Sequence, residues 1–152
     1  MLPDKKTMLK KMLEANLLDR KQVSEAIAYC KKQNEDLYHY LTTRLDKSSA
    51  KINRFFIDNF DCHPIILNDI VLNPDVLNMV PTSLMVNHLI VPAFQIRQRV
   101  YLAVSDPLDI DGLRAVMKYT GERSGILLSS KDHIIKALAE YLFKPKIASI
   151  MK

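Results

Sequence analysis

The 152-residue sequence predicts an α+β fold in which a helical half is followed by a small α/β half. Two observations carry this prediction. Apolar residues recur at helical spacing through residues 7–60, whereas the stretch from Leu89 to Pro107 holds two short apolar runs joined at Arg97-Gln98. Every residue from Val100 to Val104 is apolar. We therefore expect both faces of this second strand to be covered by helices.

Residues 1–62 should form a helical subdomain of about four short helices that share one core. Asp19, with Gln22 three residues later, resembles a capping box at the start of the second helix. The fourth helix should be capped by Ser48 or Ser49. On the second helix, one stripe of apolar side chains is expected to face the core, formed by Val23, Ala26, Ile27 and Cys30. The four helices are expected at about residues 7–15, 20–33, 36–45 and 49–60.

Residues 63–81 are predicted to be a connector, punctuated by Pro64, Pro74 and Pro81. Asn73 followed by Pro74 is typical of an N-cap with proline at the first helical position, which predicts one or two helical turns. The segment is too apolar for a free linker. We therefore expect it to pack against the rest of the chain.

An α/β subdomain is predicted over residues 82–143, with helices packed on a three-stranded sheet. The hairpin should be followed by a helix that Gly121 ends and by a strand from Gly125 to Leu128, parallel to the strand before it. The last helix should be capped by Ser129 with Asp132, or by Ser130 alone. Residues 144–152 are predicted to be a tail or the start of a linker.

Charge and composition limit the classes of function. The net charge is +5, from 22 basic and 17 acidic residues, and the densest basic run comprises Lys5, Lys6, Lys10 and Lys11. This run fits a solvated face, an acidic partner or an anionic membrane surface. A nucleic-acid partner remains an alternative, although the run lacks interleaved aromatic residues. The absence of an 18-residue apolar run and of a hydrophobic signal core favours a chain that neither spans a membrane nor is secreted by that route.

The sequence contains no constellation typical of an enzyme. It has three glycines and neither a GxxxxGK(S/T) loop nor a GxGxxG loop, so phosphate binding through either loop is unsupported. The four histidines and the cysteines Cys30 and Cys62 lack metal-ligand spacing. Both thiols are expected to be reduced packing residues, with a disulfide between them as the alternative. The acidic cluster of Asp106, Asp109 and Asp111 could hold Mg²⁺, but helix capping explains it with fewer assumptions. We predict no catalytic, cofactor-binding or metal-binding residue.

Two strings in the second half resemble the N-terminal domain of the secretion and pilus-assembly ATPases, the GspE/PilB family of type II secretion and type IV pilus systems. The first is Leu-Ile-Val-Pro at Leu89–Pro92, after Pro81, and the second is VYLAVSDPLD at Val100–Asp109. The resemblance covers about residues 8–143 and is stronger after Pro64. It identifies the chain as an MshEN-like domain.

The first half resembles the same family in spacing and departs from it in chemistry. Met12–Leu18, followed by Gln22-Val23 and Ala26-Ile27, is similar to the family string LVExGLIxxxQLxxAL, and a second, degenerate copy starts near Leu37. Family members that bind cyclic di-GMP carry Arg-Leu-Gly at the start of each copy. Here the aligned triplets are Thr7–Leu9 and Asp36–Tyr38, so both arginines and both glycines are missing. A phosphate-bearing ligand needs these groups, so the departure argues against cyclic di-GMP binding.

The resemblance implies a non-catalytic docking and regulatory domain that couples a hexameric ATPase to its inner-membrane platform. Its implied partner is the cytoplasmic domain of a membrane assembly protein, and its implied location is the cytoplasm beside the inner membrane. The family's ATPase module, with ATP and Mg²⁺, would lie beyond residue 152. Lys5, Lys6, Lys10 and Lys11 are the candidate partner-binding residues. The alternatives are a cyclic di-GMP sensor and a basic nucleic-acid-binding protein.

Overall fold

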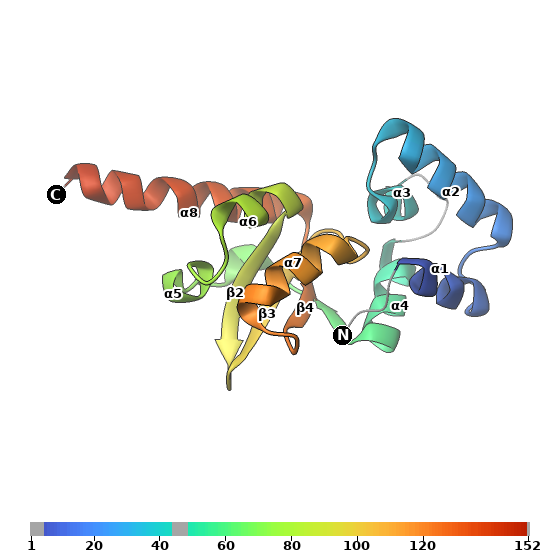
Figure 1. Cartoon of the computed structure of the whole chain (residues 1–152), viewed down its shortest axis with the longest axis horizontal. Helices are drawn as coiled ribbons and strands as arrows, with labels where there is room; N and C mark the ends of the chain where they lie inside the picture. Colours follow the sequence, from blue (N-terminus) through green and yellow to red (C-terminus); the bar gives the residue numbers. More distant parts are fainter. Residues whose placement is uncertain (1–4, 44–48, 152) are drawn as a thin grey trace. The chain divides into compact units, whose positions relative to one another are not determined.

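The computed structural model describes the backbone of residues 5–43 and 49–151, and the side chains of residues 6–41 and 50–143. Its helices and four-stranded sheet confirm the predicted α+β class (Figure 1). The chain divides into two compact units. We call Met1–His63 with Asp106–Ile110 the helical unit, and Pro64–Ser105 with Asp111–Lys152 the sheet unit.

The helical unit contains the four predicted helices: α1 (Lys5–Glu14), α2 (Arg20–Gln33), α3 (Leu37–Thr43) and α4 (Ser49–Phe60). Each helix in its described part is amphipathic, and the apolar faces supply the core. Its largest fully buried side chains are Met8, Met12, Leu41, Ile52 and Phe56. Ser48 lies outside the described residues, so of the two predicted caps only Ser49 is placed, at the first position of α4.

Local signals fix where α1 ends and α2 begins. Asn16 adopts a left-handed backbone, with φ of 58°, which stops α1. The Asp19 carboxylate accepts from the Gln22 backbone N–H at 2.7 Å, and the Gln22 side chain accepts from the Asp19 N–H at 3.0 Å. The predicted capping box is therefore confirmed.

The sheet runs in the order β1-β4-β3-β2, so it has four strands where the sequence predicted three. The extra strand is β1 (Cys62–Pro64), which crosses the predicted boundary between the helical subdomain and the connector. Three residues that include a proline carry no alternating pattern, which is why the strand was missed. The other strands are β2 (Ile90–Ile96), β3 (Arg99–Val104) and β4 (Gly125–Leu128).

The hairpin of β2 and β3 forms as predicted. The strands are antiparallel, and both residues of the connecting turn, Arg97 and Gln98, have positive φ, at 50° and 68°. Positive φ at both turn positions is the geometry of the tight hairpin turn that matches strand twist. Neighbouring Leu102 and Ala103 on β3 are both fully buried, so the prediction that β3 is covered on two faces is confirmed. β3 and β4 are parallel, also as predicted.

Short helices and one long helix complete the sheet unit: η1 (Leu67–Asp69, a 3-10 turn), α5 (Pro74–Leu77), α6 (Thr82–His88), α7 (Ile110–Thr120) and α8 (Lys131–Met151). The Asn73 side chain caps α5 by accepting from the Asp75 N–H at 2.9 Å. Gly121, with φ of 108°, ends α7 as predicted. Ser130 accepts from the His133 N–H at 3.2 Å, which selects Ser130 as the cap of α8.

Candidate functional site

An apolar hollow lies between α1 and α2 in the helical unit. It has a volume of about 560 Å³ and is lined by Leu9, Leu13, Val23, Ile27, Lys6 and Lys10. The aliphatic side chains form its walls, and the two lysines lie four residues apart on α1, where they share one face. Lysine presents a hydrocarbon stem to such a wall and keeps its ammonium group in water. The hollow therefore combines an apolar floor with a positive rim.

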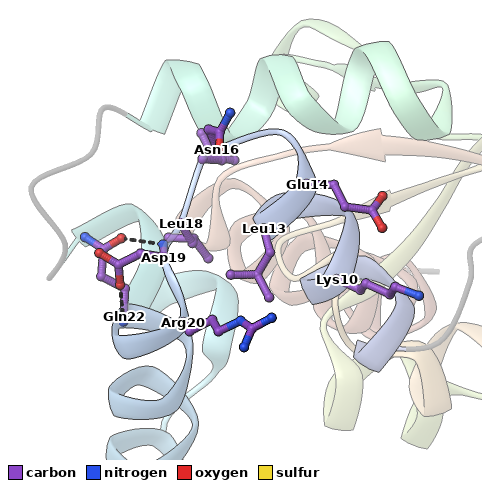
Figure 2. A pocket seen from close by; sticks show the side chains of 9 residues that line it. Lys10, Leu13, Glu14, Asn16, Leu18, Asp19, Arg20 and Gln22 are labelled. Carbon is purple, nitrogen blue, oxygen red and sulfur yellow. Dashed lines mark hydrogen bonds between the residues drawn. The ribbon is translucent and has the colours of Figure 1, made fainter.

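A second hollow of about 650 Å³ lies at the turn from α1 to α2 and shares Lys10 and Leu13 with the first (Figure 2). Its further lining residues are Glu14, Asn16, Leu17, Leu18, Asp19, Arg20 and Gln22. The Asp19 and Gln22 side chains are held in the capping box. Because the two hollows share lining residues, we treat them as one surface and call it the α1–α2 groove.

Of the four lysines predicted to bind a partner, Lys6 and Lys10 line this groove. The Lys11 ammonium instead lies 5.2 Å from the centre of the Phe60 ring, a cation–π contact within the helical unit. The side chain of Lys5 lies outside the described side chains. Among the described lysine side chains of this run, Lys6 and Lys10 are therefore available at the groove rim, whereas Lys11 stabilises the helical unit.

Sequence reasoning missed the aliphatic part of the groove. It placed Ile27 on the core-facing stripe of α2, but Ala26 is the one buried residue of that helix, and 47% of the Ile27 surface is exposed. The sequence signal that could have indicated the exposure of Ile27 was the width of the apolar stripe on α2. A 14-residue helix that carries more apolar surface than a small four-helix core can cover must leave some of it at the surface.

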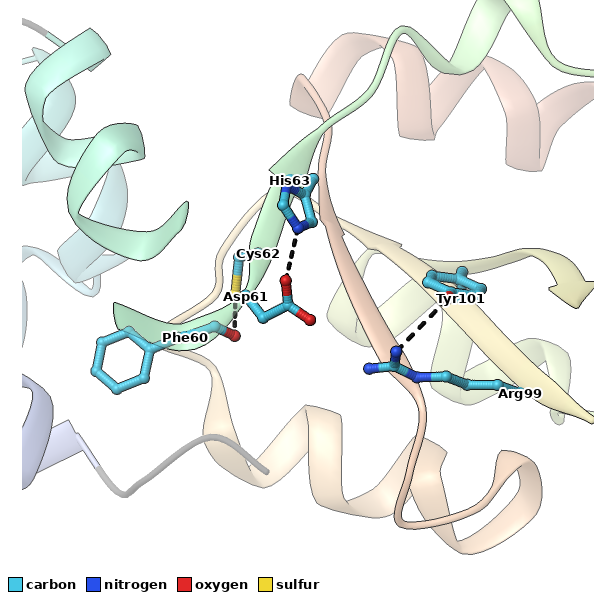
Figure 3. A network of polar contacts seen from close by, with 6 residues as sticks. All are labelled: Phe60, Asp61, Cys62, His63, Arg99 and Tyr101. Atoms are coloured by element: carbon cyan, nitrogen blue, oxygen red, sulfur yellow. Dashed lines mark hydrogen bonds and ion pairs between the residues drawn. The ribbon is translucent and has the colours of Figure 1, made fainter. Parts of the chain in front are cut away.

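Two ionisable side chains of the helical unit have strongly raised pKa values. Burial, with a smaller contribution from the charge of Asp106, raises the pKa of Tyr38 to about 12. Burial, with a smaller contribution from Asp61, raises the pKa of Cys62 to about 12. The Tyr38 hydroxyl donates to the Asn53 side chain. The Cys62 thiol donates to the Phe60 carbonyl at 3.6 Å (Figure 3). Both groups stay protonated at neutral pH, and a protonated thiol is a poor nucleophile.

The acidic cluster is accounted for by backbone geometry. The Asp106 carboxylate accepts from the Leu108 N–H at 2.9 Å and so builds the turn that precedes α7. Asp109 occupies the position directly before α7, and Asp111 lies in its first turn. Within the residues that the structure describes, no group of three or more His, Cys, Asp or Glu side chains is placed to hold a metal ion. Both cysteines are free thiols.

Comparison with known proteins decides the family. The model of the MshEN domain matches residues 60–145, more than half of the chain. The chain belongs to the MshEN domain family. A search of curated proteins finds no match. In the described part of this MshEN domain no helix has both the length and the apolar character needed to cross a bilayer.

Solved structures show the same fold. The structure of MshE with cdg aligns with a TM-score of 0.65 at 14% identity, over 88% of this chain and 97% of that chain. The N-terminal domain of XpsE aligns with a TM-score of 0.60 at 14% identity, over 91% and 96% of the two chains. Its I4122 crystal form aligns at 0.54 and 13%, over 91% and 97%. These matches confirm the predicted resemblance to the N-terminal domain of the GspE/PilB ATPases.

Proposed function

We propose that this MshEN domain is a non-catalytic docking and regulatory domain of a type IV pilus assembly or type II secretion ATPase. In this proposal it couples the motor to the cytoplasmic domain of an inner-membrane platform protein and is thereby held at the cytoplasmic face of that membrane. The observation that carries the proposal is the α1–α2 groove, whose aliphatic walls and lysine rim fit a protein segment.

The partner segment that fits the groove is an amphipathic helix with acidic residues beside its apolar face. Docking would cover Ile27, 47% exposed in the chain alone, and the half-buried Leu13 and Val23. Burying aliphatic side chains at an interface supplies affinity, in the manner of a helix seated in a groove. Carboxylates on the partner would pair with Lys6 and Lys10 and set its orientation.

A cyclic di-GMP sensor is the second candidate, because the similar MshE structure was obtained with cdg and the hollow at the α1–α2 turn lies within the first motif copy. The residues that replace the two motif glycines argue against cyclic di-GMP binding. Leu9 stands at the first glycine position and is 6% exposed, and Tyr38 stands at the second, with its ring 5.8 Å from that of Phe56. A side chain at either position hinders the close approach of a phosphate to the backbone, which glycine allows.

Other features of the same copies argue in the same direction. Thr7 and Asp36 stand at the two arginine positions, so neither of these positions supplies a cationic fork, and Asp36 would repel a phosphate. Asn16 stands at the glycine of the LVExGLI string, where it keeps the left-handed backbone at φ of 58°. Asn16 therefore supplies the left-handed backbone that glycine adopts readily, while the two motif arginines are missing.

Calorimetric titration with the cytoplasmic domain of the cognate platform protein tests the docking proposal. Ile27→Ser should weaken binding by about tenfold, because it removes one buried aliphatic contact worth about 1.5 kcal/mol. Lys10→Glu should weaken binding further at low salt. The matched control is Lys21→Glu, an exposed charge reversal on α2 outside the groove lining. Absence of binding to any platform component, or equal loss with Lys21→Glu, would contradict the proposal.

A further inference from the structure

A second surface lies in the sheet unit, at the turn end of the β2–β3 hairpin. The strand register places Ile96 opposite Arg99, and Phe94 opposite Tyr101, so these four side chains share one face of the sheet. Tyr101 stands opposite Gly125 of β4. A side chain at Gly125 would put its Cβ 2.5 Å from the Tyr101 ring, so the ring lies directly over this glycine. We call these side chains, with Arg97 and Arg123, the hairpin face.

The Arg99 guanidinium makes three contacts, one with Arg123 and two with Tyr101. Its Nε donates to the Arg123 carbonyl at 2.7 Å. Its Nη1 donates to the Tyr101 hydroxyl at 3.5 Å (Figure 3). The guanidinium carbon lies 5.1 Å from the centre of the Tyr101 ring. Tyr101 is in turn stacked on Phe94, with centroids 5.0 Å apart and planes at 30°. Arg99 is therefore oriented before any ligand arrives.

The outer part of the guanidinium remains available to a ligand. Nε is fully used, but Nη1 makes only a long hydrogen bond, and no carboxylate in the described part of the chain forms an ion pair with Arg99. The two Nη groups present a fork that matches a carboxylate. Because Arg99 is already ordered, binding a carboxylate there costs little side-chain entropy.

The charges around Arg99 are strongly one-sided. Strands β2, β3 and β4 contain no acidic residue, and Glu122 is the only one in the turn before β4. Asp61, directly before β1, already lies 2.6 Å from the His63 ring nitrogen. Exposed Arg97 and Arg123 add two further positive charges. Beside them Ile96 leaves 53% of its surface exposed. The hairpin face thus offers arginine forks, an aromatic support and one aliphatic contact.

We propose that the hairpin face binds an acidic peptide segment of a protein partner, with an Asp or Glu carboxylate on the Arg99 fork and an aliphatic side chain against Ile96. Charge complementarity and the pre-oriented arginine support this occupant. Aromatic residues and arginine are the side chains that dominate protein–protein hot spots. The inference concerns the sheet unit alone and does not depend on the α1–α2 groove.

Fluorescence anisotropy of the intact chain tests the proposal with a labelled peptide of sequence Glu-Glu-Ile-Glu-Glu. We expect saturable binding at low salt and none for Gln-Gln-Ile-Gln-Gln. Arg99→Lys keeps the charge and removes the fork, so it should weaken binding by about tenfold. Arg97→Asn should weaken binding several-fold without harming the turn, because asparagine accepts the positive φ at this position. The matched control is Arg114→Gln on the exposed side of α7, which should leave the affinity unchanged.

Three results would overturn the proposal. The first is failure of the acidic peptide to bind in low salt, and the second is an equal loss of affinity in Arg114→Gln. The third is Arg99-dependent binding to phosphatidylserine vesicles without peptide binding, which would assign the face to an anionic membrane. Loss of platform binding after changes in the groove, with peptide binding intact, would show that the two surfaces act separately.

Discussion

The two units of this MshEN domain differ in how closely they follow their family. The family model matches residues 60–145, which includes nearly all of the sheet unit but, of helices α1 to α4, only Phe60 at the end of α4. The sheet unit has a strand that is buried on both faces, at Leu102 and Ala103 of β3. The helical unit keeps its helices while its motif positions change. The difference indicates that the pattern of apolar residues is enough to maintain a fold, whereas the residues at a few motif positions determine what that fold can bind.

The surfaces of the two units also differ in kind. The α1–α2 groove pairs lysines with aliphatic walls, whereas the hairpin face pairs arginines with stacked aromatic rings. Lysine supplies a mobile point charge, and a stacked arginine supplies an oriented fork. The first suits the rim of a helix-binding groove and the second suits recognition of a particular carboxylate.

The largest effect is expected in the core of the helical unit. Phe56 is fully buried and contacts Tyr38, Phe55 and Phe60 through their rings. Phe56→Ala should lower the free energy of unfolding by about 3–5 kcal/mol. Urea unfolding followed by circular dichroism measures this change. The matched control is Phe143→Ala, at a side chain 63% exposed, which should change stability by less than about 0.5 kcal/mol. Equal losses in the two variants would contradict the described core.

A smaller effect is expected in the sheet unit at Gly125. Gly125→Ala places a methyl group 2.5 Å from Tyr101 ring carbons, so the ring must move. We expect a loss of about 1–3 kcal/mol, the usual cost of overpacking. Replacing Tyr101 by Thr in the same chain removes the clash. The double variant should therefore lose less than the sum of the two single variants. Strict additivity in thermal unfolding would show that ring and glycine are not in contact.

The effect on stability that is smallest at neutral pH comes from the ionisation of Cys62 and Tyr38 in the helical unit, because it develops only above pH 9. Their pKa values are raised to about 12 in the folded chain, from ordinary values of 9.0 and 10.0. Above pH 9 the unfolded chain loses these protons first, so the raised values contribute stability that is complete below pH 9 and is lost as the pH rises towards 12. Urea midpoints measured from pH 8 to pH 11 should fall, and the fall should be shallower in Cys62→Ala. An identical slope in that variant would contradict the assignment.

Much of the fold could be predicted because a few residues determine the local structure around them. Two helices begin at side-chain caps, α2 at Asp19 with Gln22 and α5 at Asn73 with Pro74. Helix α7 ends at Gly121, whose positive φ stops it. None of these signals needs tertiary context. The Arg97-Gln98 turn was found from its place between two apolar runs, although neither residue is a usual turn former. Strand β1 could not be found, since its pairing depends on β4, far away in sequence.

The candidate surfaces were only partly predictable, because each depends on how elements pack. The lysine run indicated a basic region, but its division between the groove rim and the Phe60 ring depends on the position of α4. Ile27 continues an apolar stripe in sequence and lies at the surface in three dimensions. The hairpin face needs the register that sets Ile96 against Arg99, and the turn that brings the Arg123 carbonyl to the Arg99 Nε.

The central claim is that the helical unit receives a protein partner in the α1–α2 groove. Its most direct test is an NMR titration of the ¹⁵N-labelled chain with the cytoplasmic domain of the cognate platform protein. The account predicts that the largest amide shifts fall on Leu9, Leu13, Val23 and Ile27, which line the groove. Shifts confined to the sheet unit, or the same groove shifts produced by cyclic di-GMP at micromolar concentration, would contradict it.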